Sequence, residues 1–90
     1  MRVSWTPRAI LDTGHIWRYI ARDNPVAATD VVDAIFNCAS LLAQQPHLGR
    51  AGKRARSLGV GAYPYIIRYR IRRDEVEILS IWHDRQKRPR

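Results

Sequence analysis

The stretch PYIIRYRIRRDEVEILSIWHD, residues 64–84, decides the fold because two periodic patterns meet in it. In its first half, apolar and cationic side chains alternate: Tyr65, Ile67, Tyr69 and Ile71 on one parity, Arg68, Arg70 and Arg72 on the other. A period of two predicts a half-buried strand with an apolar inner face and a cationic outer face. A second apolar segment, Glu75–Trp82, begins two residues later, which predicts an antiparallel hairpin.

The register of this hairpin follows from the side chains that it brings together. A two-residue turn at Arg73 and Asp74 gives the pairs Arg72–Glu75, Arg70–Glu77, Tyr69–Ile78 and Tyr65–Trp82. In this register Val76, Ile78 and Trp82 join the apolar face, and the glutamates face the arginines on the outer face. Ile66, Leu79 and Ile81 also fall on the outer face. A slip of one residue would mix the two faces, so the pattern specifies the register.

The remaining elements are predicted from helix-start signals and apolar spacing. Thr6-Pro7 and Asn24-Pro25 each place a capping residue before a proline at the first helical position. We expect an N-terminal strand in residues 1–5, helices from Pro7 to about Arg22 and from Pro25 to about Gln45, and a strand near Ala55–Val60. The expected buried stripes of the helices are Ala9, Thr13, Ile16, Trp17, Ile20, Ala28, Val31, Val32, Ile35, Ala39 and Leu42.

The predicted fold class is therefore α+β: an N-terminal strand, an antiparallel helical hairpin and then a three-stranded antiparallel sheet. Ninety residues correspond to a single domain, residues 1–90. No apolar run approaches the ~18 residues that would cross a bilayer, and the N-terminus lacks the apolar region of a signal peptide. We expect a cytoplasmic protein that does not engage membranes. The single cysteine, Cys38, fits a reducing compartment.

The charge of the chain is distributed unevenly. Four arginines and four aspartates cancel in residues 1–45, so the net charge of +8 lies entirely in residues 46–90. From Pro46 to Arg73 there are eight Lys/Arg residues and no acidic residue. This asymmetry indicates an anionic partner, either a nucleic acid or an acidic protein segment. His15 and His47 have no metal-ligating neighbours in sequence, and we expect neither a metal nor a cofactor.

Four segments in this order resemble the RelE/ParE superfamily of toxins from type II toxin–antitoxin systems. They are YIARDNPVAA, LLAQQPHLGRAGK, YPYIIRYRI and VEILSIWHDRQKRP. The resemblance extends from Trp5 to Pro89. It implies a cognate antitoxin and a role in growth arrest, as in plasmid stabilisation systems. RelE-like members cut messenger RNA in the ribosomal A site, whereas ParE-like members poison DNA gyrase.

Cleavage of RNA by its 2′-hydroxyl needs a base, a cation beside the phosphate and an acid. RelE-like nucleases have an arginine directly after the aromatic residue of the strand that matches PYIIRY, and here that position is Ile66. His83 fits a catalytic histidine position, but residue 84 is aspartate, not tyrosine. A nuclease would use Arg68, His83 and Arg85. The aliphatic Ile66 favours the ParE branch, with gyrase inhibition as the predicted function.

The outer face of the hairpin and the preceding basic loop form the predicted partner-binding surface. Its residues are Arg50, Lys53, Arg54, Arg56, Ile66, Arg68, Arg70, Leu79 and Ile81. An acidic, amphipathic antitoxin segment would match this mixture of cationic and aliphatic side chains. Two alternatives stay open from the sequence: a ribosome-dependent mRNA endonuclease, and an inactive member that binds only an antitoxin.

Overall fold

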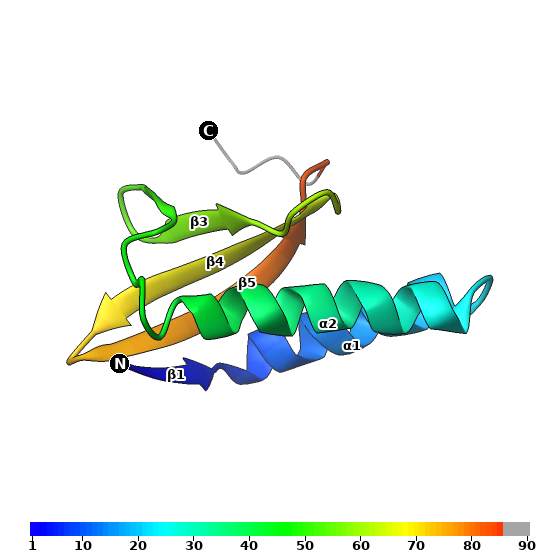
Figure 1. Ribbon diagram of the computed structural model, residues 1–90, viewed down its shortest axis with the longest axis horizontal. Coiled ribbons are helices and arrows are strands. Elements are labelled where there is room, and N and C mark those ends of the chain that lie inside the picture. The colour runs from blue at the N-terminus through cyan, green and yellow to red at the C-terminus, as the bar shows by residue number, and fades with distance from the viewer. Residues whose placement is uncertain (86–90) are drawn as a thin grey trace.

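A computed structural model describes residues 1–85 as a sheet with two helices packed along one face (Figure 1). The elements in chain order are β1 (Arg2–Trp5), α1 (Pro7–Ala21), α2 (Pro25–Leu41), β2 (Arg50–Ala51), β3 (Arg56–Gly59), β4 (Tyr65–Arg72) and β5 (Glu75–His83). The helices form an antiparallel hairpin whose connection extends past the sheet. The predicted α+β class is confirmed. Helix α2 ends at Leu41, four residues earlier than predicted, since the chain turns there toward β2.

The sheet is larger than the predicted three strands. Its order is β1-β5-β4-β3-β2, with antiparallel pairing everywhere except between β1 and β5, which are parallel. β1 pairs Arg2 with Glu75 and Trp5 with Ile78, so the N-terminal strand becomes one edge of the sheet. The two-residue β2 forms the other edge, in a segment that the sequence suggested was a loop. The parallel pairing of β1 with β5, which joins the two ends of the chain, has no local signal in the sequence.

The core lies between the inner face of the sheet and the helical hairpin. Its buried residues are Ala9, Val31, Ile35, Ala39, Leu42, Val60, Tyr65, Ile67, Tyr69, Val76, Ile78 and Ile81. The inner parity of β4 is confirmed, because Tyr65, Ile67 and Tyr69 are all buried. Trp17 was wrongly assigned to the core. It lies on the flank of α1, 39% exposed, with its Nε1 atom 3.4 Å from the Thr29 hydroxyl of α2.

A β-bulge changes the predicted hairpin register partway along. Near the turn the predicted pairs are correct, from Arg72–Glu75 to Tyr69–Ile78. Beyond the Tyr69–Ile78 pair, Arg68 pairs with Ser80, which leaves Leu79 as the extra residue of a bulge. Every later residue of β5 therefore changes face. Two assignments were wrong for this reason: Ile81 is buried, at 4% exposure, and Trp82 lies on the outer face.

Helix α1 satisfies the backbone of β5 where β1 no longer reaches it. The Thr6 hydroxyl accepts a hydrogen bond from the Ala9 amide, as an N-cap, and donates one to the Leu79 carbonyl at 2.9 Å. The Asp12 carboxylate accepts a hydrogen bond from the Ile81 amide at 3.0 Å. Buried backbone groups need such partners. The two side chains therefore stabilise β5 at and just after the bulge.

A second tether joins the loop after α2 to the inner face of β4. The buried Tyr69 hydroxyl donates a hydrogen bond to the Pro46 carbonyl and accepts one from the Gly49 amide, both at 2.8 Å. A Cβ atom on Gly49 would lie 2.7 Å from the Tyr69 ring and 2.8 Å from the Ser57 carbonyl oxygen. Only glycine therefore allows this close approach. The tether fixes the start of the basic loop relative to the sheet.

Candidate functional site

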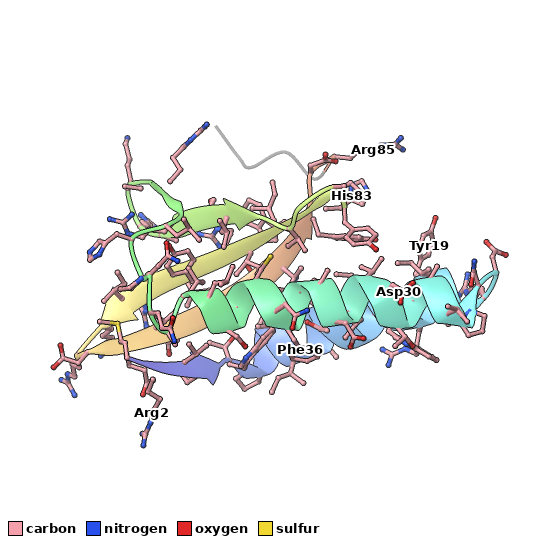
Figure 2. All side chains as sticks on the ribbon, in the orientation of Figure 1. Arg2, Tyr19, Asp30, Phe36, His83 and Arg85 are labelled. Atoms are coloured by element: carbon pink, nitrogen blue, oxygen red, sulfur yellow. The ribbon has the colours of Figure 1, made fainter. Side chains whose placement is uncertain are left out.

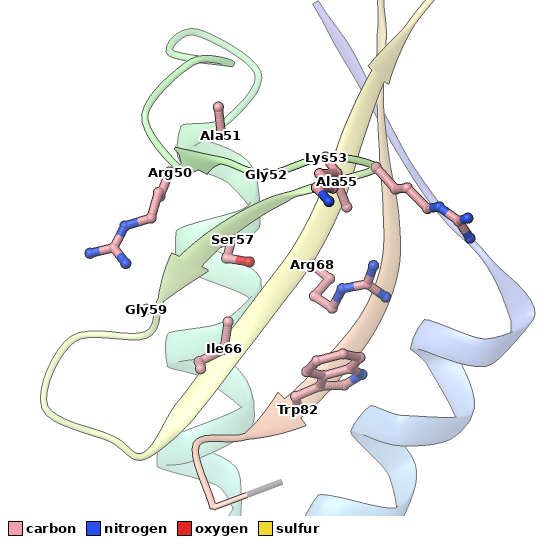
Figure 3. Close-up of a pocket in the computed structure, with 11 residues that line it drawn as sticks. Arg50, Ala51, Gly52, Lys53, Ala55, Ser57, Gly59, Ile66, Arg68 and Trp82 are labelled. Atoms are coloured by element: carbon pink, nitrogen blue, oxygen red, sulfur yellow. The ribbon is translucent and has the colours of Figure 1, made fainter. Parts of the chain in front are cut away.

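An open groove crosses the outer face of the sheet, on the side away from the helices (Figure 3). Its volume is about 870 Å³. Strands β3, β4 and β5 supply Ser57, Gly59, Ile66, Arg68 and Trp82, and the segment from β2 to β3 supplies Arg50, Ala51, Gly52, Lys53, Arg54 and Ala55. Five residues of the predicted partner-binding surface thus line one depression. Their role in binding a partner stays a prediction.

The electrostatics of the groove follow from its lining. Four of its residues are cationic: Arg50, Lys53, Arg54 and Arg68. No aspartate or glutamate is among the lining residues. The three loop cations are exposed, whereas Arg68 is half-buried on the strand. Cations gathered in a concave surface without counter-charges favour an anionic occupant.

Arg68 and Trp82 form a stacked pair within the groove. The Arg68 Cζ atom lies 4.5 Å from the centroid of the Trp82 ring, a cation–π distance. The pair exists because the bulge brings Trp82 to the outer face. Sequence reasoning missed Trp82 as a site residue. A signal was present, however, since the apolar alternation of β5 breaks at Ile78-Leu79 and a polar Ser80 follows.

Two predicted cations of the outer surface are engaged within the protein instead of lining the groove. The Arg56 guanidinium donates a hydrogen bond to the Gly49 carbonyl at 2.9 Å and so holds the basic loop in place. Arg70 pairs with Glu77, with 2.6 Å between Nε and Oε1. Arg70 and Glu77 have half-exposed side chains, and such a pair contributes little to stability. The half-buried Leu79, at the bulge, also does not line the groove.

The three candidate nuclease residues do not assemble around one point. His83 pairs with Tyr65 of the inner parity, and the two rings make an edge contact with centroids 5.2 Å apart. Its Nδ1 atom accepts a hydrogen bond from the Arg85 amide at 3.0 Å, and Figure 2 shows both residues at the end of β5. Arg68 stacks on the opposite face of the sheet. A nuclease would need His83 and Arg68 together, and the structure places them on opposite faces of the sheet.

Within residues 1–85, two side chains have clearly shifted pKa values, and burial is the main cause for each. Desolvation raises the pKa of the Cys38 thiol above its ordinary value of 9.0. Burial also raises the pKa of the Tyr65 phenol, and the nearby Tyr19 adds to the shift. Both shifts favour the neutral form, so neither group is an activated nucleophile. Within residues 1–85, no group of three or more His, Cys, Asp or Glu side chains is placed to hold a metal.

Comparison with known proteins agrees with this architecture. A sequence profile described as "ParE toxin of type II toxin-antitoxin system, parDE" matches residues 3–88. The chain belongs to this ParE toxin family. Putative toxin Y4kP of Sinorhizobium fredii is 44% identical to this ParE-family toxin over 90 residues, and the match covers 98% of this chain and 93% of Y4kP.

Two further comparisons extend the likeness. Toxin RelE3 of Caulobacter vibrioides is 36% identical to this ParE-family toxin, covering 91% of it and 92% of RelE3. A chain of the chromosomal ParDE toxin–antitoxin system from P. aeruginosa superposes with a TM-score of 0.80 at 25% identity, covering 92% and 95% of the two chains. The predicted superfamily is confirmed, and membership implies a cognate antitoxin. No helix within residues 1–85 is long and apolar enough to cross a membrane.

Proposed function

We propose that this ParE-family toxin arrests growth by inhibiting DNA gyrase, and that it stabilises the state in which gyrase has cleaved DNA. The observation that supports this function most is the separation of His83 from Arg68 on opposite faces of the sheet. A nuclease needs its acid, base and cation around one phosphate. Ile66 also occupies the position of the RelE-like arginine and lines the groove. This arrangement supports a toxin that acts by binding.

The proposed antitoxin contact uses the basic groove on the outer face of the sheet. An acidic, amphipathic antitoxin segment covers the outer face, where four groove cations have no carboxylate beside them in the lining. Charge attraction accelerates this encounter, and apolar contacts with Ile66 and Trp82 slow dissociation. Arg68→Glu should therefore weaken antitoxin binding, while Arg22→Glu, at the far end of the helical hairpin, should leave it nearly unchanged. Equal affinities for the two variants would remove the outer face from the antitoxin contact.

The target is tested by expressing the protein from a tightly repressed promoter. Gyrase inhibition predicts filamentous cells, induction of the DNA-damage response, and accumulation of cleaved DNA when purified protein is added to gyrase. Abrupt loss of translation with cleaved transcripts would instead identify an mRNA endonuclease and overturn the proposal. Healthy growth together with antitoxin binding would identify an inactive member and would also overturn it.

Substitution of His83 separates binding from RNA cleavage. His83→Ala should keep its toxicity, since the proposed activity uses no acid–base chemistry. His15→Ala, at an exposed position of α1, is the matched control. If His83→Ala loses toxicity while it still folds and binds antitoxin, and His15→Ala remains toxic, the endonuclease is the better explanation.

A further inference from the structure

We infer that the basic groove binds a single strand of DNA, with one base stacked on Trp82 and neighbouring phosphates held by the loop cations. The inference rests on the proposed function, because DNA held open by gyrase supplies the strand. It assigns to Trp82 and Ser80 roles that the motifs in the sequence did not suggest. Three separate features of the groove support it.

The first feature is the arrangement of charge. Arg50, Lys53 and Arg54 are exposed on the segment from β2 to β3 that lines the groove, and Arg68 lines it from β4. A polynucleotide carries one charge per nucleotide and follows such a wall with several phosphates at once. No carboxylate of residues 1–85 lines the groove, so its described lining does not repel a polyanion.

The second feature is an aromatic ring within reach of these cations. Trp82 is half-buried on the groove floor, and one face of its indole lies against the Arg68 guanidinium. A base that takes this place on the indole releases Arg68 to pair with a phosphate. Bases in a duplex are already stacked on their neighbours, so only an unpaired base fits. The ring therefore selects single strands.

The third feature is an unsatisfied hydroxyl beside the stack. Ser80 pairs with Arg68 across the β4–β5 ladder and is buried, with only 6% of its surface exposed. Its Oγ atom is the only buried side-chain polar atom in residues 1–85 that lacks a hydrogen-bond partner. A buried polar group without a partner is unfavourable and calls for an explanation. Ser80 lies opposite Arg68 in the ladder, so a strand that displaces Arg68 would bring a phosphate or base near this hydroxyl, which could then donate to it.

A nucleic acid strand would compete with the antitoxin segment for this groove. The antitoxin contacts Ile66 and Trp82 in the proposed complex, and the rest of the apolar lining consists of small alanines, so few aliphatic contacts are available on the floor. Ile81, which was predicted to lie on this face, is buried in the core. The lining thus combines cations with one accessible aromatic face, as in sequence-tolerant sites for single strands.

Binding is measured directly with a fluorescein-labelled oligothymidine of about twelve nucleotides. Wild-type protein should bind it with quenching of tryptophan emission, and the logarithm of affinity should fall with the logarithm of salt at a slope of roughly −3 for four phosphate contacts. Trp82→Ala should weaken binding about 10- to 100-fold. Arg68→Ala should reduce the slope by about 0.7.

Matched variants separate the groove from the rest of the surface. Trp17→Phe removes an exposed tryptophan from α1 and should leave the quenching intact, whereas Trp82→Phe should abolish it and keep most of the affinity. Ser80→Ala should weaken binding about fivefold while the thermal midpoint stays level or rises, since the lost hydroxyl has no partner in the free protein. Arg22→Ala should bind as wild type.

Several results would overturn the inference. They are absence of oligothymidine binding at low salt, equal effects of Arg22→Ala and Arg68→Ala, and unchanged affinity in a folded Trp82→Ala. Equal binding of poly-glutamate would reduce the groove to a general polyanion surface. Tenfold tighter binding of oligouridine would make RNA the ligand. Failure of the proposed function is distinguishable, because gyrase would then show no excess of cleaved DNA although oligothymidine still binds.

Discussion

The two faces of strand β4 differ in burial and in charge, although their residues alternate along the same eight-residue strand. The inner face, formed by Tyr65, Ile67 and Tyr69, is buried against the helices. The outer face, with Ile66 and Arg68, lines an open basic groove. One strand thus contributes to both the core and the proposed contact surface, because successive side chains point to opposite sides. Substitutions one residue apart should therefore affect stability and binding separately.

The largest expected effect comes from adjacent isoleucines on the two faces. Ile67→Ala removes a fully buried side chain and should lower the free energy of unfolding by about 2–5 kcal/mol. Ile66→Ala, on the half-buried groove side, should cost less than about 1.5 kcal/mol. Urea denaturation of both variants provides the measurement. Equal losses would mean that the outer face is as closely packed as the inner one.

Two glycines, one packed against the inner face of the sheet and one at the outer groove, allow a second comparison of the two faces. Gly49→Ala places a methyl group against Tyr69 and the Ser57 carbonyl and should destabilise the protein by about 1–3 kcal/mol. Gly59→Ala, at the groove, meets no atom within 4 Å and should be neutral or slightly stabilising. Thermal unfolding followed by circular dichroism compares the pair. If Gly49→Ala is tolerated as well as Gly59→Ala, the tether of the basic loop is not rigid.

The helix start that supports β5 is expected to contribute about 1 kcal/mol. Thr6→Ala removes both the N-cap and the hydrogen bond to the Leu79 carbonyl, and should cost about 0.5–2 kcal/mol. Thr6→Ser keeps the hydroxyl and should recover most of that loss. Amide exchange at residues 78–82 should accelerate in Thr6→Ala alone. Uniform acceleration in both variants would show that the hydroxyl does not hold the bulge.

The smallest effect is expected at the β4–β5 turn, remote from both the core and the groove. Arg73 and Asp74 have φ angles of 52° and 60°, which confirms the two-residue turn in a left-handed conformation that suits glycine. Asp74→Gly should therefore stabilise the hairpin by about 0.5–1 kcal/mol. Oligothymidine affinity should not change. A lower unfolding midpoint would indicate that Asp74 makes a compensating interaction.

The candidate site could be predicted only in part. Alternation correctly assigned Arg68 and Ile66 to the outer face, and the charge distribution pointed to the loop cations that line the groove. The hairpin register predicted the Arg70–Glu77 pair, which the structure confirms. It could not show that Arg56 donates to the Gly49 carbonyl, since that contact depends on how the loop folds. It also could not place Trp82, because the bulge reverses the parity that a strict alternation assumes.

The sequence by itself determined the local elements, the two faces of β4 and the concentration of positive charge in the second half of the chain. These depend on side-chain period, capping residues and composition, which act over a few neighbouring residues. Tertiary structure decided the parallel pairing of β1, the bulge and the faces of Ile81 and Trp82. The bulge is supported by Thr6 and Asp12, 73 and 69 residues away from their partners in β5. Hydrogen bonds over such separations exist only once the helix has packed on the sheet, so no local pattern could reveal them.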